Sequence, residues 1–181
     1  MEIPISQTAE AALILRIKSG ETNAYKFLYD ANVTLLYRFL KQFRKNDSDV
    51  QELVQRSFIK AYDALSTFNG LSKFKTWLFQ IALNELRSDA RRKTILPFID
   101  AEEIDEPNDY NEEEAIVWNT TLQTIFDQLD DTKRAVFILY EVEGYSHSEI
   151  AEMLKIGEST SRTILTRTKQ WLRSQLKEQR G

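Results

Sequence analysis

Five side chains that can hydrogen-bond to the edges of bases lie within eight residues near the end of the chain. They are Ser159, Thr160, Arg162, Thr163 and Thr166. Direct readout of duplex DNA needs such donors and acceptors near the start of a helix that enters the major groove. Two further cations, Arg167 and Lys169, would meet phosphate groups, which set register and affinity. The pattern predicts a surface that reads duplex nucleic acid, and a solvated basic face is the alternative.

The element that must present these side chains is a helix that begins at Glu158 and follows a shorter one. Ser146-His147-Ser148-Glu149 fits a capping box, which predicts the start of the short helix and leaves His147 facing solvent or phosphate. Lys155-Ile156-Gly157 then predicts a turn. A short helix, a tight turn and a longer basic helix form the helix-turn-helix pattern. An αα-hairpin without a role in DNA binding has similar apolar spacing and stays open as the alternative.

A second polar surface is predicted in the first half of the chain, on a helix that begins near Thr76 and turns Trp77 toward the core. Its exposed face carries Gln80, Asn84, Arg87 and Arg91, with Arg92 at the end. The preceding loop supplies Phe68, Asn69, Ser72, Lys73, Phe74 and Lys75. Rings and amides in such a loop hold unpaired bases by stacking and hydrogen bonding. The alternatives are an ordinary turn and basic residues that only complement the helix dipole.

Opposite charges are segregated along the chain, although the whole carries a net charge of −4. Residues 100–114 hold nine acids and no base, whereas residues 71–93 carry a net charge of +4 and residues 159–180 a net charge of +5. Two basic segments on either side of an acidic one indicate two surfaces for a polyanion, joined by a solvated tether.

The composition excludes several kinds of function. The absence of cysteine removes disulfides, thiolate nucleophiles and cysteine metal sites, and a single histidine removes histidine-rich metal centres, so no cofactor is expected. Apolar runs such as residues 11–15 and 136–140 fall far short of the roughly 18 residues that a membrane span requires. The first residues do not resemble a secretion signal. We therefore expect a cytoplasmic protein that does not insert into a membrane.

Only five glycines and three prolines interrupt the chain, and the apolar spacing predicts an all-α fold of two small domains. An N-terminal helical bundle is expected over residues 1–95, an acidic linker over 96–114, and a C-terminal helix-turn-helix domain over 115–181. The helices of the bundle are expected over 8–18, 23–43, from a capping box at Ser48 onward, and from Thr76. Those of the second domain are expected over 116–129, after a cap at Asn111, and from a cap at Asp130 to Gly144.

Taken together, the two halves resemble bacterial sigma factors of the extracytoplasmic-function (ECF) group, within the sigma-70 family of RNA polymerase sigma factors. In the first half the resemblance lies in residues 49–55, in Phe58, Lys60 and Ala61, and in residues 68–84. In the second half it lies in residues 129–130, Arg134, residues 136–137, 141–146 and 149–152. Two matches in the right order are more specific than either one alone.

The resemblance implies a factor that binds core RNA polymerase and directs promoter-specific initiation, without catalysis of its own. It assigns the polymerase contact to Asp49, Glu52, Leu53, Gln55 and Phe58. Asp49 and Glu52 could instead be acids that only stabilise a helix N-terminus. The loop and helix from Phe68 onward would open and read the minus-ten element, and the helix after Glu158 would read the minus-thirty-five element. Promoter DNA and an anti-sigma factor are the further partners implied.

Six residues depart from the pattern of the family. Arg56 stands where an acid is usual, Leu83 where an arginine is frequent, Asp89 one position after the usual aspartate, Lys155 in place of a turn glycine, Ser161 in place of a small buried aliphatic residue, and Ile164 in place of a common arginine. These departures leave the class intact and affect the polymerase-binding surface and the choice of promoter.

Two other functions remain as alternatives. A stand-alone helix-turn-helix regulator would bind duplex DNA without polymerase, usually as a dimer on half-sites about one helical turn apart. An enzyme is the more distant alternative, because the acids of the predicted linker have neither a partner base nor a phosphate-binding loop. Transcription with purified core polymerase separates the three functions.

Overall fold

A computed structural model of the chain describes residues 7–95 and 124–178. The chain divides into two compact units, an N-terminal unit of residues 1–100 and a C-terminal unit of residues 101–181. Every regular element within the described ranges is helical, which confirms the expected all-α class. No helix in these ranges is long and apolar enough to cross a membrane.

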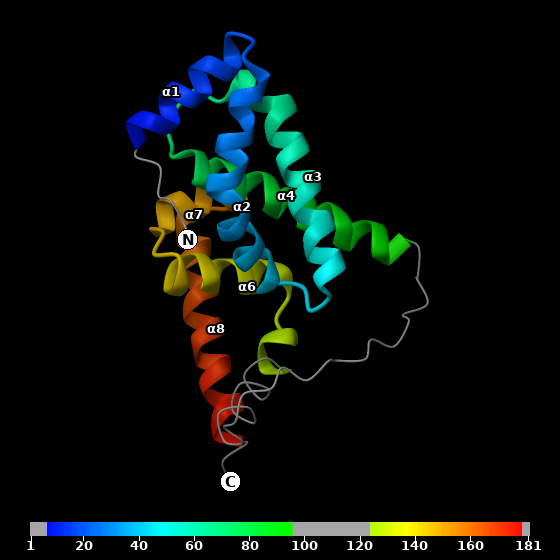
Figure 1. Ribbon diagram of the computed structural model, residues 1–181. Helices are drawn as coiled ribbons and strands as arrows, with labels where there is room; N and C mark the ends of the chain where they lie inside the picture. The colour runs from blue at the N-terminus through cyan, green and yellow to red at the C-terminus, as the bar shows by residue number, and fades with distance from the viewer. Residues whose placement is uncertain (1–6, 96–123, 179–181) are drawn as a thin grey trace, which may run out of the picture. The chain divides into compact units, whose positions relative to one another are not determined.

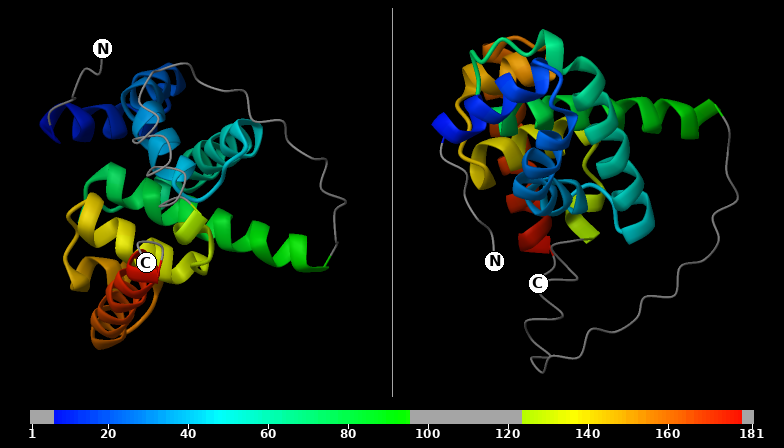
Figure 2. Two further views of the ribbon diagram at one scale, coloured as in Figure 1. Left: turned by 90° about the horizontal axis from the view of Figure 1, so that it is seen from below. Right: turned by 45° about the horizontal axis from the view of Figure 1, so that its top comes forward.

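The N-terminal unit is a bundle in which three long helices enclose the core (Figure 1). Its elements are α1 (Gln7–Lys18), the 3-10 turn η1 (Thr22–Ala24), α2 (Tyr25–Lys41), α3 (Asp47–Ala64), the 3-10 turn η2 (Leu65–Thr67) and α4 (Phe74–Ile95). Helices α2 and α3 run antiparallel, and α4 packs across both of them (Figures 1 and 2). The stacked rings of Phe39 and Phe79, 4.1 Å apart, join α2 to α4 inside this core. The bundle therefore holds the polymerase-contact candidates on α3 and the promoter candidates on α4 in one rigid frame.

Helix α3 begins earlier than the sequence predicted. Its N-cap is Asn46, whose side-chain oxygen accepts hydrogen bonds from the backbone N–H groups of Ser48 at 2.7 Å and Asp49 at 3.2 Å. The capping box expected at Ser48 is therefore wrong, because Asn46 is the N-cap and Ser48 already lies in the first turn of α3, where its own N–H donates to Asn46. Asp49 consequently lies in the first turn of α3, with its side chain only half-buried.

The C-terminal unit packs short helices against one long helix. Its described elements are residues 124–127, α6 (Asp131–Phe137), the π-helical turn η3 (Ile138–Val142), α7 (His147–Leu154) and α8 (Glu158–Glu178). Both α6 and α7 pack against α8 (Figure 1). The structure confirms Asp130 as the N-cap of α6 and the reciprocal Ser146–Glu149 capping box of α7. The α7–α8 pair thus has the predicted helix-turn-helix order.

One predicted helix of the second half is shorter than expected. The helix expected from Asp130 to Gly144 is α-helical only to Phe137, and its last part winds into the π turn η3 before Gly144 turns the chain with a φ of 74°. The acidic linker, the cap at Asn111 and most of the helix expected over 116–129 lie outside the described residues. The linker and the domain boundaries drawn from it stay predictions.

Candidate functional site

The first turns of α8 present the predicted base-reading side chains to solvent. Six of the seven residues assigned to the upstream element are exposed: Ser159, Thr160, Arg162, Thr163, Thr166 and Arg167. A groove of about 290 Å³ is lined by four of them, Ser159, Thr160, Thr163 and Arg167, together with Ile164 and Lys133 of α6. Hydroxyl, guanidinium and ammonium groups thus converge on one surface. This arrangement is suited to a polyanion whose edges also carry hydrogen-bonding groups.

Two of the three threonine hydroxyls on this surface, those of Thr163 and Thr166, are less available to a base than the sequence suggested. The hydroxyl of Thr163 donates to the carbonyl of Ser159, and that of Thr166 donates to the carbonyl of Arg162, each at 2.9 Å. Such bonds within the helix occupy the hydroxyl hydrogen. What remains for a base is an oxygen lone pair and a methyl group, and the methyl group can contact the methyl of thymine.

Two of the cations on α8 already have acidic partners. Arg162 pairs with Glu158 one turn earlier, and Lys169 Nζ lies 2.7 Å from Glu141 of η3. All four side chains are exposed by about a third or more, so each pair contributes little to stability and can exchange its partner. A phosphate group would therefore compete with Glu158 and Glu141 for these cations.

His147 is buried rather than exposed, which corrects the expectation that it faces solvent or phosphate. Its ring stacks on Tyr140 with the centroids 4.5 Å apart, and its Nδ1 lies 2.9 Å from the hydroxyl of Ser161. Ser161 is fully buried between the exposed Thr160 and Arg162. The polar residue at a usually aliphatic position therefore makes a buried hydrogen bond that fixes the start of α8 against α7.

The burial of His147 makes the stability of the C-terminal unit depend on pH. Burial lowers the pKa of His147 from 6.5, nearby Arg162 lowers it further, and Glu158 opposes them. Since the unfolded chain takes up the proton at a higher pH than the folded unit, we expect stability to fall as the pH drops below about 6.5. The loss should level off below the pKa of the folded state. Denaturation of the full chain between pH 7.5 and 5 measures it.

His147→Gln provides the comparison, because glutamine can still bond to Ser161 but does not titrate. Its own free energy of unfolding should change much less over the same pH range. An equal decline in both proteins would show that His147 is not the titrating group.

The turn between α7 and α8 contains a strained residue. Lys155 adopts the left-handed conformation with a φ of 54°, which favours glycine, and it is the only non-glycine residue among those described with a positive φ. Its backbone N–H bonds to the carbonyl groups of Ala151 and Glu152, as in other left-handed helix ends. Lys155 thus adopts, at the end of α7, the backbone conformation that glycine favours.

The loop before α4 differs from the prediction in which of its side chains are available. Phe68 and Phe74 are buried, and both pack against Trp77 with centroid distances of 5.1 Å and 5.8 Å. The expectation that these two rings stack on unpaired bases is therefore wrong for this conformation, because both rings are buried in the apolar core of the bundle. They anchor the two ends of the loop instead.

The tip between these anchors is open to solvent. Asn69, Ser72 and Lys73 are exposed as predicted, and Leu71 is 89% exposed. Leu71 was not among the predicted residues, although a large apolar residue between Gly70 and Ser72 in a polar turn indicates an exposed contact. Asn69 accepts a hydrogen bond from the N–H of Leu71 at 3.1 Å, and Gly70 has a φ of 76°. The loop therefore presents a leucine that contacts little of the protein itself.

The helix that follows the loop places its polar residues as expected. Asn84 is exposed, Gln80 and Arg87 are half-buried, and Lys75 lies with its Nζ 5.1 Å above the ring of Phe79. Arg91 and Arg92 fall in the last turns of α4, where side-chain positions lie outside the described residues. Asn84 and Arg87 thus keep polar groups of α4 at least partly open to solvent.

Helix α3 presents Glu52 and Gln55 to solvent and Asp49 partly so, as the assigned protein contact requires. Leu53 is fully buried in the bundle, so its assignment to a direct contact is wrong: the side chain faces the core one position after Glu52. Phe58 is also buried, but it lies at the base of an apolar groove. The groove measures about 540 Å³ and is lined by Tyr25, Tyr29, Gln55, Phe58, Ile59 and Tyr62.

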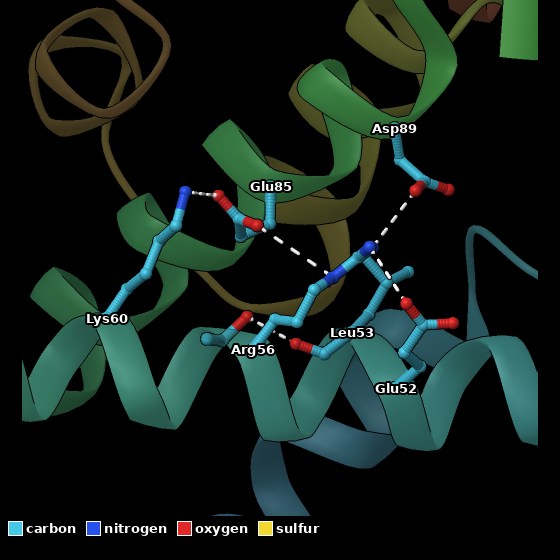
Figure 3. Close-up of polar contacts among 7 residues, drawn as sticks. Glu52, Leu53, Arg56, Lys60, Glu85 and Asp89 are labelled. Atoms are coloured by element: carbon cyan, nitrogen blue, oxygen red, sulfur yellow. Dashed lines mark hydrogen bonds and ion pairs between the residues drawn. The ribbon is translucent and has the colours of Figure 1, made fainter. Parts of the chain in front are cut away.

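A charge network that includes Glu52 joins α3 to α4 (Figure 3). Arg56 donates to Glu52 at 2.9 Å and to Asp89 of α4 at 3.0 Å, and its Nε lies 3.9 Å from Glu85 of α4. Glu85 is almost fully buried and also pairs with Lys60. Two of the six departures, Arg56 and Asp89, thus form one contact. The arginine reduces the acidity of the α3 surface and compensates the carboxylates of α4.

Comparison with known proteins supports the sequence resemblance over both halves. Residues 28–95 match the family Sigma-70 region 2, and residues 120–172 match Sigma-70, region 4. The ECF RNA polymerase sigma-E factor of Haemophilus influenzae is 31% identical over 192 residues, covering 94% of this chain and 96% of the relative. The ECF RNA polymerase sigma factor SigW of Bacillus subtilis is 28% identical over 178 residues, covering 91% of this chain and 95% of SigW.

Solved structures show the same fold. CnrH, in complex with the cytosolic domain of CnrY, superposes with a TM-score of 0.65 at 24% identity, covering 93% of this chain and 97% of CnrH. The sigma factor RpoE of Bartonella quintana, in complex with the anti-sigma factor NepR, gives a TM-score of 0.68 at 23% identity, covering 84% of this chain and 96% of RpoE.

Proposed function

The chain belongs to the ECF group of sigma-70 family RNA polymerase sigma factors. From this membership we propose which of its surfaces contacts core polymerase and which contact each promoter element. As a sigma factor it binds core RNA polymerase and directs promoter-specific transcription initiation. The observation that carries the proposal is the separation of three exposed surfaces over two units. They are an acidic and apolar face on α3, the loop tip with α4, and the start of α8.

The α3 face is the proposed contact with core polymerase. The acidic residues and the apolar groove of this face lie next to each other. Gln55 follows Asp49 and Glu52 at a spacing of three residues, and it also lines the groove. Ile59 and Tyr62 at this groove are 61% and 40% exposed. An apolar patch bordered by polar groups is typical of a protein interface. A partner helix with basic and apolar side chains would match both parts.

The loop tip and α4 are the proposed contact with the minus-ten element. Leu71 would pack against a base lifted out of the stack, while Asn69 and Ser72 bond to its edge and Lys73 meets phosphate. Phe68 and Phe74 serve as anchors, as their burial requires. Asn84, Arg87, Arg91 and Arg92 extend the contact along the backbone of the strand.

The start of α8 is the proposed reader of the minus-thirty-five element, and Arg162 is its best test. Arg162→Ala should weaken binding to the upstream element by about 1–3 kcal/mol if the guanidinium is bidentate to a guanine. The loss of its exposed pair with Glu158 costs little by itself. Binding of the holoenzyme to a panel of upstream variants measures the effect. A loss confined to one base position indicates base readout, and a uniform loss indicates phosphate contact. Unchanged binding across the panel would contradict the assignment.

The remaining parts of the proposal concern partners, location and catalysis. We propose that the protein acts in the cytoplasm, has no catalytic activity of its own, and is held inactive by an anti-sigma factor. CnrH and the Bartonella RpoE, which share its fold, were each solved with such a protein or with a cytosolic partner domain. The domains proposed are residues 1–95 for polymerase and the minus-ten element and 115–181 for the minus-thirty-five element, with 96–114 as the linker.

Transcription with purified core polymerase tests the proposal directly. The chain should form a complex with core polymerase at micromolar concentrations and confer initiation on templates selected from a pool of random duplexes. Core polymerase without the chain is the control. A folded chain that binds selected duplexes alone, and gives no complex and no transcript with core polymerase, would favour the stand-alone regulator.

A further inference from the structure

Helix α1 has no part in the surfaces described so far, yet two of its charged side chains reach the loop before α4. Glu10 Oε1 accepts a hydrogen bond from the backbone N–H of Phe74 at 3.0 Å. Lys18 Nζ donates to the backbone carbonyl of Phe68 at 2.6 Å and also lies 3.3 Å from that of Ser66. The two contacts are made from opposite ends of one helix, more than two turns apart.

Each contact satisfies a backbone group that the loop leaves without a helical partner. Phe74 is the first residue of α4, where N–H groups have no carbonyl one turn earlier, and a carboxylate there also complements the helix dipole. Ser66 and Phe68 lie at the end of η2, where carbonyl groups are left over in the same way. Glu10 therefore holds the end of the loop, and Lys18 holds its beginning.

Only the tip lies between these two contacts. Residues 69–73 are all exposed, whereas Phe68 and Phe74 on either side are buried. The tip is the segment that presents Leu71, Asn69 and Ser72. Its position relative to α4 is thus set by two buried rings and by two hydrogen-bonded side chains of α1.

We propose that α1 positions the strand-capturing loop, with Glu10 and Lys18 as positioning residues that fix the backbone at its two ends. The proposal rests on the role assigned above to this loop. A loop held in its binding conformation loses less conformational entropy when it captures a base, so affinity for the open strand rises without any contact between α1 and DNA. Without the two contacts, the loop tip must be ordered by the strand itself.

An ion pair at the end of α1 supplies matched controls. Arg16 lies two residues before Lys18, but its guanidinium donates to Glu21 at 2.8 Å, and both side chains of this pair are about half exposed. Arg16→Met and Glu21→Met thus change the same charges in the same region without touching the loop. Two conservative changes complete the set: Glu10→Gln keeps an acceptor for Phe74, and Lys18→Arg keeps donors for Phe68.

The test uses holoenzyme assembled from the full chain and a promoter selected from random duplexes by the unmodified holoenzyme. Glu10→Met and Lys18→Met, alone and together, are compared in the permanganate reactivity of unpaired thymines and in affinity for core polymerase. We expect the double variant to open the promoter about tenfold less, with affinity for core polymerase within about twofold of the unmodified chain. Glu10→Gln, Lys18→Arg and the two controls should open it normally.

The outcomes that overturn the proposal are specific. Normal opening by the double variant would show that α1 does not position the loop. Equal losses in the Arg16→Met and Glu21→Met controls would make the effect one of charge, and a parallel loss of polymerase affinity in the single variants would make it one of folding. Failure of the unmodified holoenzyme to select any promoter would instead refute the proposed function itself, and it is detected before any variant is made.

Discussion

Replacing Asp49 and Glu52 together by lysine is expected to abolish the complex with core polymerase. Both carboxylates lie on the α3 face, and Glu52 is 63% exposed at the side chain. Placing like charges opposite each other in an interface costs several kcal/mol, so the affinity should fall by roughly a hundredfold or more. Titration of labelled core polymerase with each chain measures the loss.

The fold should survive this change. Arg56 loses Glu52 but keeps Asp89, and Asn46 continues to cap α3 through backbone groups that the substitutions leave in place. Asp30→Lys is the matched control, because Asp30 is an exposed carboxylate of α2 that pairs with Lys26 of the same helix. Unaltered polymerase affinity in a folded double variant would contradict the assignment of the α3 face, and lost helicity would show that the two acids are structural.

Patterns of apolar and charged residues were sufficient to predict the class of fold and the order of its helices. The capping box at Ser146 and the cap at Asp130 could be predicted because each depends on residues within one turn of the chain. The cap of α3 was misplaced by two residues, since Asn46 and Ser48 are both good caps and the sequence does not show which one the chain uses. Local chemistry thus identified the elements but not every boundary.

The errors in the site have a different cause, because they depend on contacts between distant residues. Phe68 and Phe74 look available in a loop, and only their packing with Trp77 shows otherwise. His147 looks like an exposed capping-box residue until Tyr140 and Ser161 are placed beside it. The contacts of Glu10 with Phe74 and of Lys18 with Phe68 span 64 and 50 residues. No local pattern in one sequence carries that information.

Arg56, one of the departures from the family pattern, contacts three carboxylates of α3 and α4. Arg56→Met should therefore destabilise the N-terminal unit strongly. The change leaves Asp89, 16% exposed, and Glu85, 4% exposed, with Lys60 as the only cation among the contacts of Figure 3. Removing one partner from a largely buried pair leaves an uncompensated charge. We expect a loss of about 2–3 kcal/mol in the free energy of unfolding, below the full value for a buried pair because Lys60 remains.

A second substitution separates charge from packing, since methionine retains most of the apolar length of the arginine side chain. If the loss is electrostatic, adding Asp89→Asn to Arg56→Met should recover stability, whereas Asp89→Asn alone should cost stability by leaving Arg56 with one carboxylate fewer. This coupling between the two positions is what a double-mutant cycle measures by urea denaturation. Arg56→Met also releases Glu52 for the polymerase, so the affinity for core polymerase should hold or rise while the stability falls. Additive effects of the two substitutions, or a polymerase affinity that falls together with stability, would mean that Arg56 acts through packing and not through its charge.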